Sequence, residues 1–246
     1  MTGDEDAPST SGRADPLDGR AFSNLAHELR NPLAVILGYA ELLRVRDDES
    51  TRIEAANRIS EAAQHLGYVA DDLLTVFAIE SGMLEIEPAP VDLESIVKDA
   101  LAGFAATEHD YVFSSEAENG RWPRIEADSQ HVSRILTNLV LNACRRSPDA
   151  REVAVSVRTD DGFAAVTVSD NGVALTNEQI ARAFDRLAPI EVPGHPEIRS
   201  SGLELYKVRR LVELQGGAVT AESGPGRRGS RFTFTLPLAD DLSDRR

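Results

Sequence analysis

The first segment able to do chemistry is Ala-His-Glu-Leu-Arg-Asn-Pro, at residues 26–32. Around it, large apolar residues recur in alternating steps of three and four, apart from an interruption at Pro32, as in the helices of a bundle. On this register His27 occupies the position farthest from the apolar seam, with the carboxylate of Glu28 beside it. An imidazole held in water can act as a nucleophile or carry a proton. The apolar positions are Phe22, Leu25, Leu29, Ile36, Tyr39 and Leu43.

An exposed histidine is also an ordinary surface residue, and two neighbours of His27 bear on the choice. A zinc-binding His-Glu-x-x-His motif needs a second histidine where this chain has Asn31. Pro32 removes one helical hydrogen bond and clashes with the preceding turn, at a cost of about 3 kcal/mol. Such a cost predicts a kink or a local fray just past His27, so we interpret the block as functional.

A second group of polar residues lies on an amphipathic helix predicted over residues 129–146. Asn138 and Asn142 are four residues apart and Arg145 follows about one turn later, so the three share a helix face. Amide oxygens suit a hard cation such as Mg²⁺, and a guanidinium group suits phosphate. The two asparagines are equally well explained as caps of neighbouring loops.

Three shorter segments follow along the chain. Asp-Asn-Gly at 170–172 comes after a predicted strand, and is either an ordinary turn or a carboxylate presented to a donor such as an exocyclic amine. Phe184 precedes an irregular Pro- and Gly-rich segment, where an aromatic residue more often belongs to the core. Ser-Gly-Leu at 201–203 opens a predicted helix, whose first backbone N–H groups are able to bind phosphate.

In this order, the segments resemble the transmitter core of two-component sensor histidine kinases, across roughly residues 20–238. The block at 26–32 resembles the phosphoacceptor motif of that family, 138–145 its asparagine box, 170–172 its first glycine box, Phe184 its phenylalanine box, and 201–203 its second glycine box. The resemblance implies a helical dimerisation and phosphotransfer domain. It further implies an ATP-binding α/β sandwich of the Hsp90-like superfamily, with a Bergerat-type fold.

The resemblance also implies a role for each residue that matches a motif. His27 would be the phosphorylated histidine, and Glu28 would accept or orient the proton on the other ring nitrogen. Asn31 stands where the family orients water to hydrolyse the phosphoaspartate of the regulator. The implied cofactors are ATP and Mg²⁺. Their implied ligands are Asn138, Asn142, Arg145, Asp170, Gly172, Phe184, Ser201, Gly202 and Leu203, with Mg²⁺ on Asn142, phosphates near Asn138 and Arg145, and the adenine amine on Asp170.

Both glycine boxes depart from the family pattern. Ala174 replaces a glycine of the first box, Ser200 and Glu204 replace glycines of the second, and Arg146 stands where an aromatic ring or histidine is common. An alanine at a positive φ costs about 1 kcal/mol. A carboxylate about 5 Å from a phosphate charge costs roughly 3 kcal/mol at an effective dielectric of about 20, or about a hundredfold in affinity. Glu204 therefore either partly occupies the anion site, favoured there by the helix dipole, or turns outward into solvent.

The residues of the first motif are positioned by a predicted helical hairpin. Residues 1–19 are acidic and rich in Ser, Gly and Pro, which predicts a disordered tail. A first helix of about 25 residues leads to a polar turn at 47–50, and Ser81-Gly82 closes a second helix. The expected buried stripe of the second helix is Ile59, Ala63, Leu66, Ala70, Leu73 and Phe77. One hairpin buries two such narrow stripes poorly, so a homodimeric four-helix bundle is expected.

Beyond a short linker the pattern changes to mixed α and β. Helices are predicted from Asp92 to about Phe104 and over 129–146, 177–184 and 202–214, and strands over 110–114, 123–127, 152–158, 163–169, 217–222 and 230–236. The expected fold class is α plus α/β, with a single mixed sheet backed by helices on one face. The predicted domains are a phosphotransfer domain at 20–82, a linker at 83–90, an ATP-binding domain at 91–238 and a charged tail at 239–246.

The overall composition limits the classes of binding partner and the cellular compartments that are expected for this chain. A net charge of −15 and a pI near 4.8 argue against nucleic acid and anionic membranes. The lone Cys144 excludes an internal disulfide and fits a reducing compartment. No apolar run approaches the ~20 residues of a membrane span and no signal peptide follows Met1, so a cytoplasmic protein is expected. The other histidines, His65, His109, His131 and His195, lie in no recognisable constellation and are expected to be structural or on the surface.

Two functions remain open on the sequence. In the first, ATP phosphorylates His27, and the phosphoryl group passes to an aspartate of a response-regulator receiver domain. In the second, the sandwich is a degenerate scaffold and the hairpin is a phosphotransfer or phosphatase module. The altered glycine boxes favour the second function, whereas Asn142, Asp170 and Gly202 favour the first, which is the one we expect. A sensor domain does not fit in the predicted tail, so the signal is expected to come from a separate protein, or the chain is a fragment.

Overall fold

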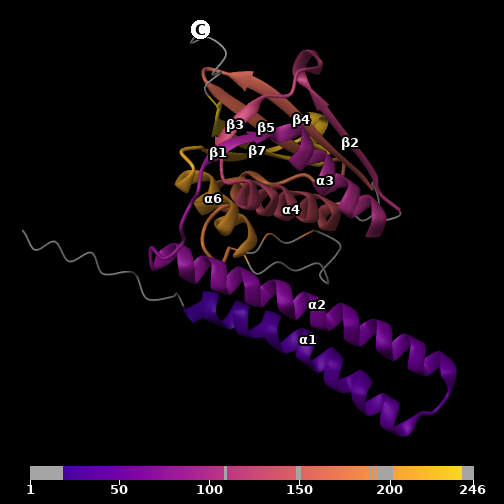
Figure 1. Ribbon diagram of the computed structural model, residues 1–246. Coiled ribbons are helices and arrows are strands. Elements are labelled where there is room, and N and C mark those ends of the chain that lie inside the picture. Colours follow the sequence, from indigo (N-terminus) through magenta and orange to yellow (C-terminus); the bar gives the residue numbers. More distant parts are fainter. Residues whose placement is uncertain are drawn as a thin grey trace, which may run out of the picture.

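A helical hairpin and an α/β domain make up the computed structural model, which describes residues 19–107, 110–147, 151–188, 190, 192 and 202–239 (Figure 1). The hairpin consists of α1, Gly19–Val45, and α2, Glu49–Glu80. Apart from Gly19 and Ala239, the two predicted tails lie outside the described residues.

Capping residues set both ends of α2. The Asp48 carboxylate accepts a hydrogen bond from the Thr51 backbone N–H at 2.9 Å and from the Ser50 and Thr51 hydroxyls. At the other end Ser81 is the C-cap, and Gly82 follows with φ +67°, a conformation that glycine adopts without strain. The predicted end of the second helix is thus confirmed. In α1 the helix continues unbroken through Pro32, whose side chain is buried, so the predicted fray is not observed.

The buried stripe of α2 differs from the predicted one. Ala63, Ala70 and Phe77 are exposed, and Phe77 is 64% accessible. The buried positions are Thr51, Ala55, Ala62, Val69, Asp72, Val76 and Ile79. Four of these, Ala55, Ala62, Val69 and Val76, recur every seven residues, as expected for a seam between packed helices, and Val76 also packs with Leu187 and Leu203. The predicted stripe was expected to be buried by a second hairpin in a homodimer, so its exposure within one chain leaves it a prediction.

The α/β domain contains a five-stranded mixed sheet in the order β2-β4-β5-β7-β6. Its strands are β2 Val112–Ala117, β4 Glu152–Asp160, β5 Phe163–Asp170, β6 Val219–Ser223 and β7 Ser230–Pro237. Only the β2–β4 pair is parallel among these strands. The prediction of a single sheet was wrong, since β1 Ala89–Asp92 and β3 Arg124–Ala127 form a separate antiparallel pair. Residues 89 and 90, expected in the linker, therefore begin a strand.

Three helices pack against one face of the sheet, in a layer between the sheet and the hairpin (Figure 1). They are α3 Leu93–Thr107, α4 Ser129–Arg146 and α6 Glu204–Leu214, while the short α5 spans Asn177–Arg182. The predicted apolar face of α4 forms the centre of this core; its residues Val132, Ile135, Leu136, Leu139 and Val140 are at most 1% exposed. Full burial of each such side chain contributes roughly 1.5–3 kcal/mol.

The hairpin meets the α/β domain mainly where α6 lies against α2 (Figure 1). A small apolar cluster of Val76, Leu187 and Leu203 forms this contact, with Leu25, Leu73 and Tyr206 packed around it. Within the described parts of the chain, no helix is both long and apolar enough to cross a membrane.

Candidate functional site

His27 lies on the exposed side of α1, where the heptad register predicted it. The adjacent Glu28 is only 8% exposed, and Asn31, one turn further on, faces solvent. Two residues before His27, Leu25 packs against the cluster that joins α2 to the α/β domain. An accessible imidazole therefore stands beside a largely buried carboxylate, close to the contact between the two parts of the molecule.

Asp170 is the polar centre of the α/β domain, at the end of β5, and is 4% exposed. Its Oδ1 accepts hydrogen bonds from the Gly172 backbone N–H at 2.9 Å and from the Ser147 hydroxyl at 3.1 Å, and its Oδ2 accepts one from the Ser230 hydroxyl. Buried polar groups are normally hydrogen-bonded, and these three donors fix the carboxylate. The segment is thus an organised carboxylate site as well as a turn.

Gly172 is required here by the close approach of the chain. A Cβ at this position would lie 2.1 Å from the backbone oxygen of Arg146 and 2.6 Å from the Ser147 hydroxyl oxygen. The same Arg146 oxygen accepts a hydrogen bond from the Val173 N–H at 3.1 Å. The loop after β5 is therefore held tightly against the end of α4.

Arg146 is a participant that sequence reasoning noted only as a departure from the family. Its side chain is 2% exposed, and Nη2 donates to the Val173 carbonyl oxygen at 2.7 Å. Among the described residues, Nε and Nη1 have no hydrogen-bond partner. Burial lowers the pKa of the Arg146 guanidinium, and the negative charge of Asp170 opposes that shift. The guanidinium of Arg146 therefore places a positive charge near Asp170, where an aromatic ring at the same position would be uncharged.

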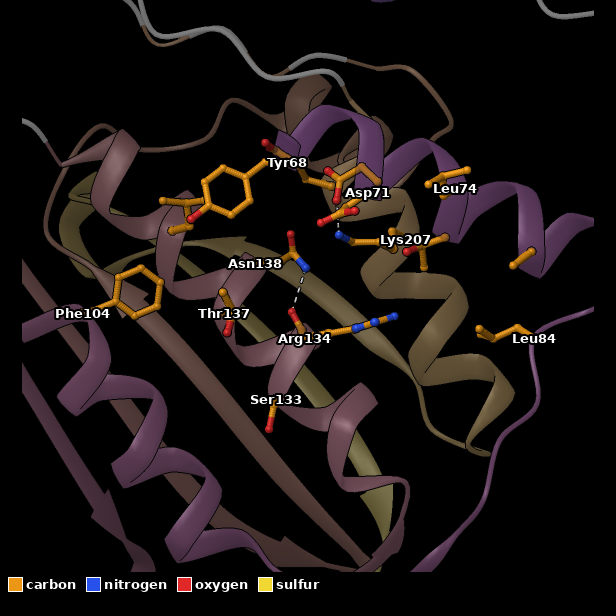
Figure 2. A pocket seen from close by; sticks show the side chains of 15 residues that line it. Tyr68, Asp71, Leu74, Leu84, Phe104, Ser133, Arg134, Thr137, Asn138 and Lys207 are labelled. Atoms are coloured by element: carbon orange, nitrogen blue, oxygen red, sulfur yellow. Dashed lines mark hydrogen bonds and ion pairs between the residues drawn. The ribbon is translucent and has the colours of Figure 1, made fainter. Parts of the chain in front are cut away.

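Helix α4 carries the three residues of the predicted asparagine box on one face. Asn142 is 9% exposed, and its Nδ2 has no partner among the described residues. Asn138 donates from Nδ2 to the Arg134 carbonyl oxygen at 2.7 Å and lines a cavity of about 530 Å³ between α2 and α4 (Figure 2). The unpaired Nδ2 of Asn142 and the guanidinium of Arg145 are suited to phosphate oxygens, whereas Oδ1 of Asn142 is the atom that would hold Mg²⁺. No cluster of three or more His, Cys, Asp or Glu able to hold a metal occurs in the described ranges.

Arg145 is paired with Glu204, the residue that replaces a family glycine. Arg145 Nη1 lies 2.5 Å from Glu204 Oε1, and the two side chains are 24% and 15% exposed. The alternative in which Glu204 turns outward into solvent is therefore wrong. The carboxylate takes the guanidinium that the resemblance assigns to a phosphate.

Gly202 and Leu203 shape the entry to α6. Gly202 has φ +68°, and a Cβ there would lie 2.5 Å from the Ala188 backbone nitrogen, so only glycine fits. Leu203 is 2% exposed and packs in the cluster that faces the hairpin. Phe184 packs edge-on against Phe232, with ring centroids 6.2 Å apart, as part of the domain core. Ser200 and Ser201 lie outside the described residues.

His65 belongs to a charged group that the sequence did not reveal. Burial lowers the pKa of this histidine on α2, Arg145 lowers the pKa further, and Glu204 opposes the shift. The charges of Arg145 and Glu204 in the α/β domain therefore act on the pKa of a histidine in the hairpin. His131 is buried, with Nε2 3.8 Å from Asp128 Oδ2, and is structural as expected. His109 and His195 fall outside the described residues.

Two family models match the chain. Residues 18–82 match the His Kinase A (phospho-acceptor) domain, and residues 127–240 match the histidine kinase-, DNA gyrase B- and HSP90-like ATPase. These matches agree with the hairpin that carries His27 and with the sheet and helices that carry Asp170. The chain therefore belongs to the two-component sensor histidine kinases, and it contains their transmitter core.

Individual relatives agree with this assignment. The sensor protein DivL of Caulobacter vibrioides is 35% identical over 243 residues, covering 94% of this chain and 30% of the relative. Full-length ShkA, solved in complex with AMPPNP, has a TM-score of 0.62 at 26% identity, covering 89% of this chain and 46% of that one. Histidine kinase ThkA, solved with the response regulator TrrA, has a TM-score of 0.66 at 21% identity, covering 90% of this chain and 62% of that one. The chain spans 27 to 45% of the length of three curated relatives it matches.

Proposed function

We propose that this chain is a protein-histidine kinase core that phosphorylates its own His27 from ATP and passes the phosphoryl group to an aspartate of a response-regulator receiver domain. The observation that carries the proposal is the exposed imidazole of His27 on a hairpin against which an ATPase-family domain packs. The complex of ThkA with a response regulator supports a partner of that class.

The hairpin residues supply the phosphotransfer chemistry. One ring nitrogen of His27 attacks the γ-phosphorus of ATP, a P–N bond forms, and the bond from that phosphorus to the bridging oxygen of ADP breaks. Glu28 accepts or orients the proton on the other ring nitrogen, which keeps the attacking nitrogen unprotonated. In the second step the receiver aspartate attacks the phosphohistidine and His27 is regenerated. Asn31 orients water in the opposing phosphatase reaction.

The α/β domain binds the nucleotide in this proposal. Asp170 accepts a hydrogen bond from the adenine amine, and Asn138 and Arg145 contact phosphates. The glycines at 172 and 202 allow neighbouring backbone segments of the domain to pack closely against each other. Asn142 holds Mg²⁺, which when bound neutralises charge that develops on the phosphates. The resemblance also assigns Phe184, Leu203 and Ser201 to the binding region, although Phe184 packs in the domain core and Leu203 packs in the cluster that faces the hairpin.

The Arg145–Glu204 ion pair supports a second candidate, a phosphotransfer or phosphatase module with weak or no ATP binding. To separate the candidates, the chain is incubated either with Mg²⁺ and ATP or with a panel of phosphorylated receiver domains, using His27→Ala as the control. Phosphate incorporated at His27 from ATP supports the kinase. Receiver dephosphorylation that needs His27 or Asn31, with no incorporation from millimolar ATP, supports the second candidate and contradicts the first.

A homodimer is part of the proposal. The hairpin leaves large apolar side chains exposed, including Leu37 at 68% and Phe77 at 64%, and a second hairpin that covered them would remove this apolar surface from water. A second hairpin would complete a four-helix bundle. Sedimentation should show a dimer that Phe77→Lys dissociates, whereas Leu214→Lys, at a 43% exposed position on α6, leaves it intact. A parent chain that sediments as a monomer at micromolar concentration would contradict the dimer.

The proposed organisation places the phosphotransfer domain at 20–82 and the ATP-binding domain from the start of β1 at residue 89 to residue 238, with the linker shortened to 83–88. A separate sensor protein, or further domains of a longer chain, would supply the signal. A cytoplasmic location is consistent with the lone buried Cys144 and with a receiver-domain partner.

A further inference from the structure

The contact between α2 and α6 contains a buried ion pair that the nucleotide and phosphotransfer chemistry does not use. Lys207 Nζ on α6 donates to Asp72 Oδ1 on α2, and the side chains are only 8% and 9% exposed (Figure 2). The two residues are 135 positions apart in the chain. The pair therefore connects the hairpin directly to the ATP-binding domain.

A second polar contact lies about two turns further along α2. Glu80 accepts a hydrogen bond from the Tyr206 hydroxyl at 2.5 Å, and its carboxylate lies 3.8 Å from Arg210 Nε. Asp72 and Glu80 are separated by about 12 Å along the helix axis, given the rise of about 1.5 Å per residue. Helix α6 therefore contacts α2 through polar groups at two points about two turns apart.

Beside this contact the two parts of the protein are separated by the cavity that Asn138 lines. In Figure 2, Tyr68, Asp71 and Leu74 of α2 lie across this space from Ser133, Arg134 and Thr137 of α4. Its volume is about 530 Å³. Because α2 and α4 do not close on each other here, the orientation of the ATP-binding domain depends on α6.

Helix α6 also connects this contact to the proposed nucleotide-binding residues and to the region around His27. Glu204, in its first turn, pairs with Arg145, and Leu203 just before it packs in the cluster that Leu25 contacts near His27. Lys207 is one turn after Glu204, on the same side of α6. A rotation of α6 on α2 would therefore move the nucleotide residues relative to His27.

The buried pair is better explained by orientation than by stability. Burial raises the pKa of Asp72, and the positive charge of Lys207 only opposes that shift. Burying two charges costs much of what their attraction returns, and apolar replacements of buried pairs are often neutral or stabilising. A buried charge does require its partner, which makes one arrangement of the two helices strongly preferred.

We propose that Asp72 and Lys207 are a positioning pair that orients the ATP-binding domain on the hairpin for phosphoryl transfer to His27, without contacting the nucleotide. This role rests on the proposed kinase function. Breaking the pair should slow the transfer step more than it weakens nucleotide affinity, because the two charged groups bind each other, although both line the cavity that Asn138 also lines.

The test compares Asp72→Asn, Lys207→Met and the swapped variant with Asp72→Lys and Lys207→Asp. For each we would measure the rate of His27 phosphorylation at saturating ATP and the dissociation constant of a fluorescent ATP analogue. Single variants should phosphorylate at least tenfold more slowly with analogue affinity within twofold of the parent, and the swap should recover most of the rate. Arg209→Met, which removes an exposed ion pair of the same helix, should match the parent.

A rate that stays unchanged or rises in the single variants would overturn the proposal, as would an equal loss of rate and affinity, or no recovery in the swap. Analogue binding also reports whether each variant has folded. If the parent itself incorporates no phosphate, the kinase function fails and amide hydrogen exchange decides the positioning role. If amide exchange in α6 and residues 69–76 is faster in the single variants and returns to the parent rate in the swap, the pair is an orienting contact. If exchange is unchanged in the single variants, the pair has no orienting role.

Discussion

Replacing Glu204 by glutamine should strengthen nucleotide binding. In the structure the Glu204 carboxylate lies 2.5 Å from Arg145 Nη1, and the two side chains are 15% and 24% exposed, so solvent screens this site only partly. A phosphate that binds Arg145 must approach within about 5 Å of that carboxylate. At an effective dielectric of about 20, one such charge pair costs roughly 3 kcal/mol, which corresponds to about a hundredfold in the dissociation constant.

Glutamine keeps the size of the side chain and removes its charge. Glu204→Gln should therefore lower the dissociation constant of a non-hydrolysable ATP analogue by about a hundredfold, because both the repulsion and the competition for Arg145 are relieved. Isothermal titration calorimetry at low and at physiological salt would measure the change. The matched control is Glu222→Gln, which removes the same charge from an exposed position on β6 of the same domain. An affinity for Glu204→Gln within threefold of the parent would refute this reasoning.

The remaining predictions concern the carboxylate site, the contact between the domains and the hairpin. Asp170→Asn presents an amide to three hydrogen-bond donors, so it should lower the free energy of unfolding by about 1–3 kcal/mol in urea titrations and abolish detectable adenine-nucleotide binding. Burial depresses the pKa of His65, so the folded protein binds fewer protons than the unfolded chain; stability should fall as pH drops below 6.5, and His65→Gln should flatten that dependence between pH 7.5 and 5.5. Asp48→Ala should speed exchange of the Thr51 amide, whereas Asp48→Asn, another good N-cap, should preserve its protection.

Local sequence signals predicted most of the elements. The polar turn at 47–50, the helix end at Ser81-Gly82, the apolar face of α4 and the alternating strands β4 and β5 are each signalled by neighbouring residues. Each was found where the pattern placed it. The exposure of His27 followed from the heptad register for the same reason. These features depend on spacing alone, so a single sequence contains enough information to locate them.

The interactions between distant segments were not predictable in this way. Glu204 was predicted either to occupy the anion site partly or to turn into solvent, and its pairing with Arg145, 59 residues earlier, depends on how α6 packs beside α4. Lys207 falls among apolar residues of an amphipathic helix, and nothing local indicates that Asp72 neutralises it. The separate β1–β3 sheet was missed because its strands are four residues each and pair across α3 and β2. Within one chain, tertiary packing also decides which positions of α2 are buried.

The measurement that tests the account most directly is phosphate incorporation at His27. The chain would be incubated with Mg²⁺ and γ-labelled ATP beside His27→Ala and His65→Ala, and alkali-stable label would be quantified and located by mass spectrometry. The account predicts label on His27 in the parent and in His65→Ala, and none in His27→Ala. A folded parent that acquires no label at millimolar ATP, or label that persists in His27→Ala, would contradict it.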